Sequence, residues 1–197
     1  PMKTLAAGTI ATLFLASTSP ALLIEWNYDY DSSGFFATTE RQAVLDAVAA
    51  QFDHVSIDSP DIMPPGGIWT WKIINPTTGA IEELNGSLSA GTVTIYVGAQ
   101  DLGNTALGLG GPSGYSLINI PPWDAEVGAL NTDAAFKPFA GTLTINNSSD
   151  LSWYDGLDDT VPLSDYDLFS VVTHELAHIL GIGTSTVDAW LIDQNAD

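Results

Sequence analysis

The sequence of 197 residues contains no cysteine. Disulfide bonds and thiolate metal sites are therefore excluded, so any metal site must use His or carboxylate ligands. Basic residues are also scarce: four Lys and Arg stand against 24 Asp and Glu, which gives a formal net charge of −20. Because such a charge repels nucleic-acid phosphates and anionic lipid headgroups, we expect no nucleic-acid partner and no peripheral membrane role.

The first 21 residues differ in composition from the rest of the chain. Lys3 is followed by a run of apolar and small residues from 5 to 16, and then by Ser, Thr, Pro and Ala up to Ala21. This pattern is typical of a secretory signal peptide cleaved near Ala21, and its apolar run is too short to span a bilayer. We predict a signal peptide over residues 1–21, an extracellular location, and no membrane insertion after cleavage. A hydrophobic first strand is the alternative interpretation.

The remaining residues, 22–197, are expected to form one globular domain, because 45% of the sequence is hydrophobic and no linker or repeat interrupts it. Alternating apolar residues predict strands at 23–30, 54–57, 68–74, 92–97 and 141–146. Helical spacing and capping signals predict helices at 39–53, with Thr39 and Gln42 as a capping box, and at 166–180. This order of elements indicates an α+β fold in which a twisted mixed β-sheet packs against two helices.

The second predicted helix carries the segment His174-Glu175-Leu-Ala-His178. Ser164 and Asp167 resemble a capping box that starts the helix near residue 165, and Gly181 is a typical C-terminal glycine. Residues four apart on a helix lie on one side, so both imidazoles can bind one zinc ion while the glutamate takes a proton from a water. Because the helix is apolar and expected to be buried, unpaired polar groups on it would be unfavourable, and a metal would remove that penalty.

The run from Asp167 to Gly181 resembles the active-site helix of the metzincin zinc peptidases, especially matrixin-like and leishmanolysin-like proteins. Residues 141–146 followed by Trp153 are similar to the strand and tryptophan that precede that helix. The resemblance implies a zincin-like fold and a secreted, zinc-dependent endopeptidase acting on a protein or peptide substrate. It implies His174 and His178 as zinc ligands and Glu175 as the general base. By its order, the glycine-rich segment 102–114 resembles the edge strand that such enzymes pair with substrate.

The third zinc ligand of the family does not carry over, because Thr184 occupies its position and the residues after Gly181 include no His, Glu, Cys or Met. The missing methionine would form the turn beneath the metal. We expect the third ligand beyond Asp197, so that residues 22–197 are a catalytic domain lacking its C-terminal part. Asp188 is a weaker candidate, and His54 is a third.

An acidic cluster precedes the second helix, at Asp150, Asp155, Asp158, Asp159, Asp165 and Asp167. Oxygen-rich loops favour calcium, so a structural Ca2+ is one interpretation, and a solvated acidic loop with helix-capping residues is the other.

Two alternatives to the peptidase stay open at this stage. One is a secreted binding or adhesion domain that keeps a zincin fold without catalysis. The other is a purely structural envelope protein whose histidines have no chemical role.

Overall fold

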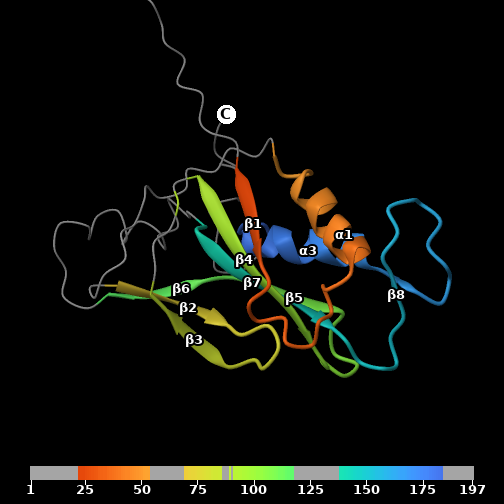
Figure 1. Cartoon of the computed structure of the whole chain (residues 1–197), viewed down its shortest axis with the longest axis horizontal. Coiled ribbons are helices and arrows are strands. Elements are labelled where there is room, and N and C mark those ends of the chain that lie inside the picture. The colour runs from red at the N-terminus through yellow and green to blue at the C-terminus, as the bar shows by residue number, and fades with distance from the viewer. Residues whose placement is uncertain (1–21, 54–68, 86–88, 90, 118–137, 184–197) are drawn as a thin grey trace, which may run out of the picture.

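The computed structural model describes residues 22–53, 69–85, 89, 91–117 and 138–183. The predicted signal peptide, His54, Thr184 and Asp188 lie outside these ranges. At the centre is a four-stranded mixed sheet (Figure 1). Its strands, in spatial order, are β1 (Leu23–Asn27), β4 (Thr92–Gln100), β7 (Ala140–Asn146) and β5 (Gly108–Pro112). The first three are parallel, and β5 runs antiparallel to β7 at the edge.

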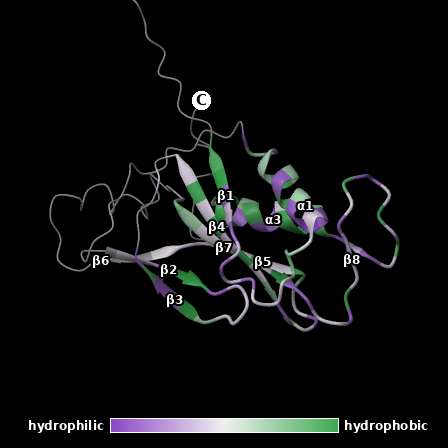
Figure 2. Cartoon of the chain, viewed as in Figure 1, coloured by the Kyte–Doolittle hydropathy of each residue, from purple (hydrophilic) through white to green (hydrophobic). Residues whose placement is uncertain are grey.

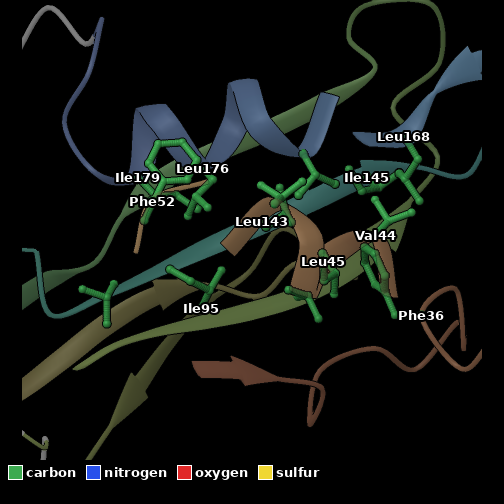
Figure 3. Close-up of a cluster of buried hydrophobic side chains, with 14 of the residues drawn as sticks. Phe36, Val44, Leu45, Phe52, Ile95, Leu143, Ile145, Leu168, Leu176 and Ile179 are labelled. Atoms are coloured by element: carbon green, nitrogen blue, oxygen red, sulfur yellow. The ribbon is translucent and has the colours of Figure 1, made fainter. Parts of the chain in front are cut away.

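Two helices, α1 (Thr39–Ala49) and α3 (Leu168–Ile179), contact each other on one face of this sheet. Leu45 of α1, Leu143 of β7 and Leu176 of α3 are fully buried where the three elements meet (Figure 3). Every residue of β7 is buried, as is usual for a strand that is covered on both faces. Because apolar burial drives folding, this cluster fixes α3 and its motif against the sheet.

A second, three-stranded antiparallel sheet contacts the first through β2 and β7. Its strands, in spatial order, are β3 (Ile81–Leu84), β2 (Trp69–Ile74) and β6 (Gly114–Leu117). The turn between β2 and β3 packs on β4 at Gly98, where an added Cβ would lie 2.9 Å from Pro76 Cγ. This close approach explains a glycine in the middle of a buried strand.

The long loop between residues 155 and 165 projects from one end of the molecule (Figure 1). Two short strands, β8 (Trp153–Tyr154) and β9 (Tyr166–Asp167), pair in parallel at its base. Hydrophilic and hydrophobic residues are mixed along this loop, and the helices likewise carry hydrophilic segments beside hydrophobic ones (Figure 2). Within the described ranges, no helix combines the length and the apolar character needed to cross a bilayer.

The α+β class, the mixed sheet and both helices are confirmed, and two helix starts need correction. The first helix is capped by Thr38, whose hydroxyl accepts from Arg41 N at 3.4 Å, and not by Thr39. It ends at Ala49, before the predicted residue 53. The second begins at Leu168, because Tyr166 and Asp167 are held in β9 by pairing with β8.

The predicted strands also changed in length. The first ends at Asn27, because the side chain of Asn27 accepts from Asp29 N at 2.9 Å and turns the chain. The strand predicted at 92–97 continues to Gln100, since β7 pairs with it along its whole second half. The predicted strand 54–57 lies outside the described residues.

Candidate metal-binding and catalytic site

The N-terminus of α3 is fixed by Asp167 alone. Its carboxylate accepts from the backbone N–H groups of Phe169 and Ser170, both at 3.2 Å, and also from the Ser170 hydroxyl. An acidic N-cap satisfies helix donors that have no partner within the helix, and its charge is favourable beside the positive end of the helix dipole. The predicted partner Ser164 donates instead to Asp165 at 3.0 Å and does not cap the helix.

The C-terminus of α3 forms a Schellman motif, as the glycine predicted. Gly181 has φ +89°, its N–H donates to His178 O at 3.0 Å, and Ile182 N donates to Ala177 O at 2.8 Å. A positive φ favours glycine, because a side chain there would clash with the backbone. The turn brings the Ile182 carbonyl back over the last helical turn, beside His178.

The two motif histidines meet on the open side of α3. Their Nε2 atoms lie 3.0 Å apart, and their rings are nearly perpendicular, at 86°. His178 Nδ1 lies 3.0 Å from Ile182 O, so Nδ1 carries the hydrogen and donates it. The lone pair of His178 is therefore on Nε2, directed at His174. A second lone pair at His174 Nε2 would be repelled unless a proton or a cation lay between the two nitrogens.

Glu175 lies on the adjacent, inner side of α3. The residue is 8% exposed, and its Cγ faces the edge strand β5, where a Cβ added at Gly108 would lie 3.0 Å away. Among the described residues, no hydrogen bond engages its carboxylate. The glutamate is thus shielded from water on the strand side and has its acceptor atoms available to a group arriving beside β5.

The two histidines are more exposed than the sequence predicted. The prediction placed both rings and the glutamate in an apolar setting, but His174 is exposed and His178 is half-buried; only Glu175 is buried. The reason is geometric: Leu168, Val172, Leu176 and Ile179 occupy the face of α3 toward the core, which leaves positions 174 and 178 to point away from it. The histidines therefore incur little penalty when no ion is bound.

The residues that are present fit a zinc ion in part. Two nitrogens that each lie about 2.05 Å from a tetrahedral zinc are roughly 3.3 Å apart, close to the 3.0 Å between the Nε2 atoms. The hydrogen bond from His178 Nδ1 to a carbonyl is the outer contact that usually orients a zinc-binding imidazole. No group of three or more His, Asp or Glu side chains that could hold a metal occurs in the part of the chain that the structure describes. Asp188 and His54 lie outside that part.

Asn146, which sequence reasoning did not single out, positions the strand beside Glu175. It is fully buried, and its side-chain nitrogen donates to Gly103 O at 2.8 Å and to Ala106 O at 2.7 Å. Its side-chain oxygen accepts from Leu102 N at 3.1 Å and Ser148 N at 3.0 Å. Three of these bonds, those to Leu102, Gly103 and Ala106, hold the loop that leads into β5 against the end of β7, and the fourth turns the chain after β7. The only sequence signal for this role is the position of the asparagine at the end of a predicted strand.

The acidic cluster does not converge on one point. Asp155 contacts Arg41 Nε at 3.4 Å, and Asp167 caps α3. Asp158 accepts from the Thr160 hydroxyl and from Thr160 N, and these bonds, with one from the Tyr154 hydroxyl, lower the pKa of the Asp158 carboxyl. With Asp165, which accepts from the Ser164 hydroxyl, four of the six carboxylates have separate partners, and the calcium site stays a prediction.

Comparisons with known proteins add no relative: no family model, curated protein or solved structure matches this chain.

Proposed function

We propose that this protein is a secreted, zinc-dependent endopeptidase with a zincin-like fold. The observation that carries the proposal is the arrangement on α3: two Nε2 atoms 3.0 Å apart on the open side, with Glu175 buried beside them against the edge strand. Two convergent imidazoles beside a buried carboxylate are unusual on a helix that has only a structural role. The Glu175 carboxylate has no hydrogen-bond partner among the described residues, and such a combination is typical of a functional site.

His174 and His178 would hold the zinc ion through Nε2. His178 is kept in the correct tautomer by its bond to Ile182 O, which the Schellman turn at Gly181 positions. A third ligand is proposed to come from a residue outside the described ranges. When bound, the ion would supply a polarised water and a positive charge near the peptide carbonyl oxygen.

Glu175 would act as the general base and then as the general acid. Its carboxylate takes the proton of the attacking water and delivers it to the departing amine nitrogen, so the same group serves both halves of the reaction. Burial against β5 excludes bulk water from one side of the carboxylate and holds it in place before the substrate arrives.

The edge strand β5 supports a peptide as the substrate. It ends the four-stranded sheet, and no described strand pairs with its outer side. An extended peptide that added there would satisfy the unpaired backbone groups and pass beside Glu175. The antiparallel direction of β5 relative to its neighbour, with α3 packed beside it, supports the zincin-like fold.

The test is Glu175→Gln in the complete natural product, with His174→Ala as the comparison. We expect Glu175→Gln to keep stoichiometric zinc but to lose roughly 10²- to 10⁴-fold in kcat on an unstructured protein substrate, because the amide cannot accept the proton. His174→Ala should lose the zinc itself, measured by elemental analysis after dialysis.

Two outcomes would contradict the proposal. One is near-wild-type hydrolysis by Glu175→Gln, which removes the assigned base. The other is a wild-type protein that takes up no zinc at saturating supply, which would favour a non-catalytic binding domain.

A further inference from the structure

Helix α3 lies directly on the backbone of β5 at the glutamate. A Cβ added at Gly110 would be 2.3 Å from the backbone oxygen of Glu175 and 2.8 Å from its Cβ. A Cβ essentially never lies this close to an atom of another residue, so no side chain fits at Gly110 unless the helix moves. The strand therefore reaches Glu175 only because this position has no side chain.

Gly108, two residues earlier on the same face of β5, approaches the catalytic side chain itself. A Cβ there would lie 3.0 Å from Glu175 Cγ and 3.0 Å from Val171 Cγ1. These two nearest neighbours are side-chain atoms, which can give way by a few tenths of an ångström, whereas the third, the backbone oxygen of Thr144, lies 3.3 Å away on the paired strand β7. An alanine at Gly108 is thus compatible with the fold, but it pushes on the glutamate.

Backbone conformation does not explain these two glycines. Neither has a positive φ, the region that favours glycine, whereas Gly103 and Gly181 do. On the opposite face of the same strand, a Cβ at Gly111 would meet nothing within 4 Å. On the face toward α3, a side chain is therefore excluded at Gly110 and crowded at Gly108, and both positions contact Glu175.

We propose that Gly108 and Gly110 are positioning residues for Glu175. The two bare positions set how closely the carboxylate approaches the edge strand, and hence its distance from a peptide bond in a substrate paired with that strand. This inference rests on the proposed function and adds the part of the sheet that places the base. Because a misplacement of about 1 Å can lower a rate by roughly 10²-fold, a push of a few tenths matters.

The test is Gly108→Ala in the complete protein. Gly114→Ala in β6 is the matched control, because a Cβ at Gly114, unlike one at Gly108, would meet nothing within 4 Å. We expect Gly108→Ala to keep its zinc content and its KM within about twofold while kcat falls roughly tenfold. In the Glu175→Gln background the same substitution should cause no further loss, because its effect passes through the carboxylate. Equal losses in both backgrounds would overturn the inference.

Two further measurements separate positioning from packing. Gly108→Ala should shift the ¹³C resonance of the Glu175 carboxyl carbon, assigned by its absence in Glu175→Gln, and Gly114→Ala should not.

Adding Val171→Ala to Gly108→Ala removes the contact with Val171, so the kcat loss should persist. Recovery to the wild-type kcat would assign the effect to helix packing. If Gly108→Ala alone unfolds, this double variant decides the question. An active wild type with a fully active Gly108→Ala refutes this inference alone, whereas an inactive wild type refutes the proposed function and the inference together.

Discussion

Replacing Asn146 by alanine should destabilise the protein more than any other single polar substitution beside the site. The substitution removes four hydrogen bonds from a fully buried side chain: two donated to Gly103 O and Ala106 O, and two accepted from Leu102 N and Ser148 N. A neutral hydrogen bond contributes about 1 kcal/mol net. Four such bonds therefore predict a loss of about 4 kcal/mol in the free energy of unfolding.

The assay is urea unfolding of the purified protein, with thermal unfolding as a second measure. A loss of about 4 kcal/mol corresponds to a lower Tm by roughly 8–16 °C for a domain of this size. Asn147→Ala is the matched control, because the side chain of Asn147 is exposed and makes no hydrogen bond among the described residues. Only the backbone N–H of Asn147 is engaged, and it donates to Gln100 O at 3.1 Å. We expect the control to change stability by less than about 0.5 kcal/mol.

The pH dependence of Asn146→Asp checks the two donated bonds. An aspartate keeps acceptors for the two N–H groups but turns a negative charge toward Gly103 O and Ala106 O, so the pKa of the new carboxyl should be raised above its unfolded value near 3.9. A raised folded pKa means that stability is retained below the unfolded pKa and lost as pH rises through the folded pKa. The gap between variant and wild type should thus widen from about pH 4 to pH 7. This account of the Asn146 hydrogen bonds would be refuted by an equal loss of stability in Asn146→Ala and Asn147→Ala. A stability difference between Asn146→Asp and the wild type that does not change with pH would refute it as well.

Two further predictions concern α3. Leu176→Ala should lower the free energy of unfolding by about 2–5 kcal/mol in urea titrations, because the side chain is fully buried between α1 and the sheet; Leu163→Ala, at a fully exposed position, should have almost no effect. Asp167→Ala should lose about 1 kcal/mol, because two helix donors lose their acceptor, and Asp159→Ala in the exposed loop is its control. A cap variant no less stable than its control would show that Asp167 does not set the helix start.

Local patterns predicted most of α3, because the signals for its body and its C-terminus are close together in the sequence. The apolar spacing, the His-Glu-x-x-His segment and Gly181 each indicated the same helix. Its start was misplaced, since Ser164 and Asp167 have the spacing of a capping box while the structure uses Asp167 alone. Local spacing cannot distinguish a capping box from a single acidic cap. The helix cannot start before Asp167, because Tyr166 pairs with Trp153, which belongs to another segment of the chain.

Features that depend on long-range pairing were less predictable. The strand β3 was missed because its sequence, Ile-Glu-Glu-Leu, does not alternate between apolar and polar residues, and Ile81 is 70% exposed. The order of the four-stranded sheet joins segments that are separated by tens of residues, and no periodicity records which strands pair. The segment 102–114 was placed at the edge by resemblance, and the structure does place β5 there.

The contacts beside Glu175 were invisible to sequence reasoning for the same physical reason. A glycine-rich run predicts turns when it is read alone, and only the approach of α3 shows that Gly108 and Gly110 are needed for space. Asn146 likewise looks like the polar end of a strand until its four partners are known. Both features serve the contact between an edge strand and a helix, which no single segment encodes.

These contacts connect stability with the proposed chemistry. Asn146 ties the loop before β5 to the end of β7, and Leu143, in the middle of β7, packs in the core with Leu176 of α3. Glu175 thus belongs to a helix that core packing fixes, and it contacts a strand that the buried amide of Asn146 fixes. With its backbone supported in this way, Glu175 does not need to move with its helix when a substrate arrives, and such preorganisation favours a general base. The edge of the sheet therefore contributes to the proposed active site through its backbone, although it supplies no reactive side chain.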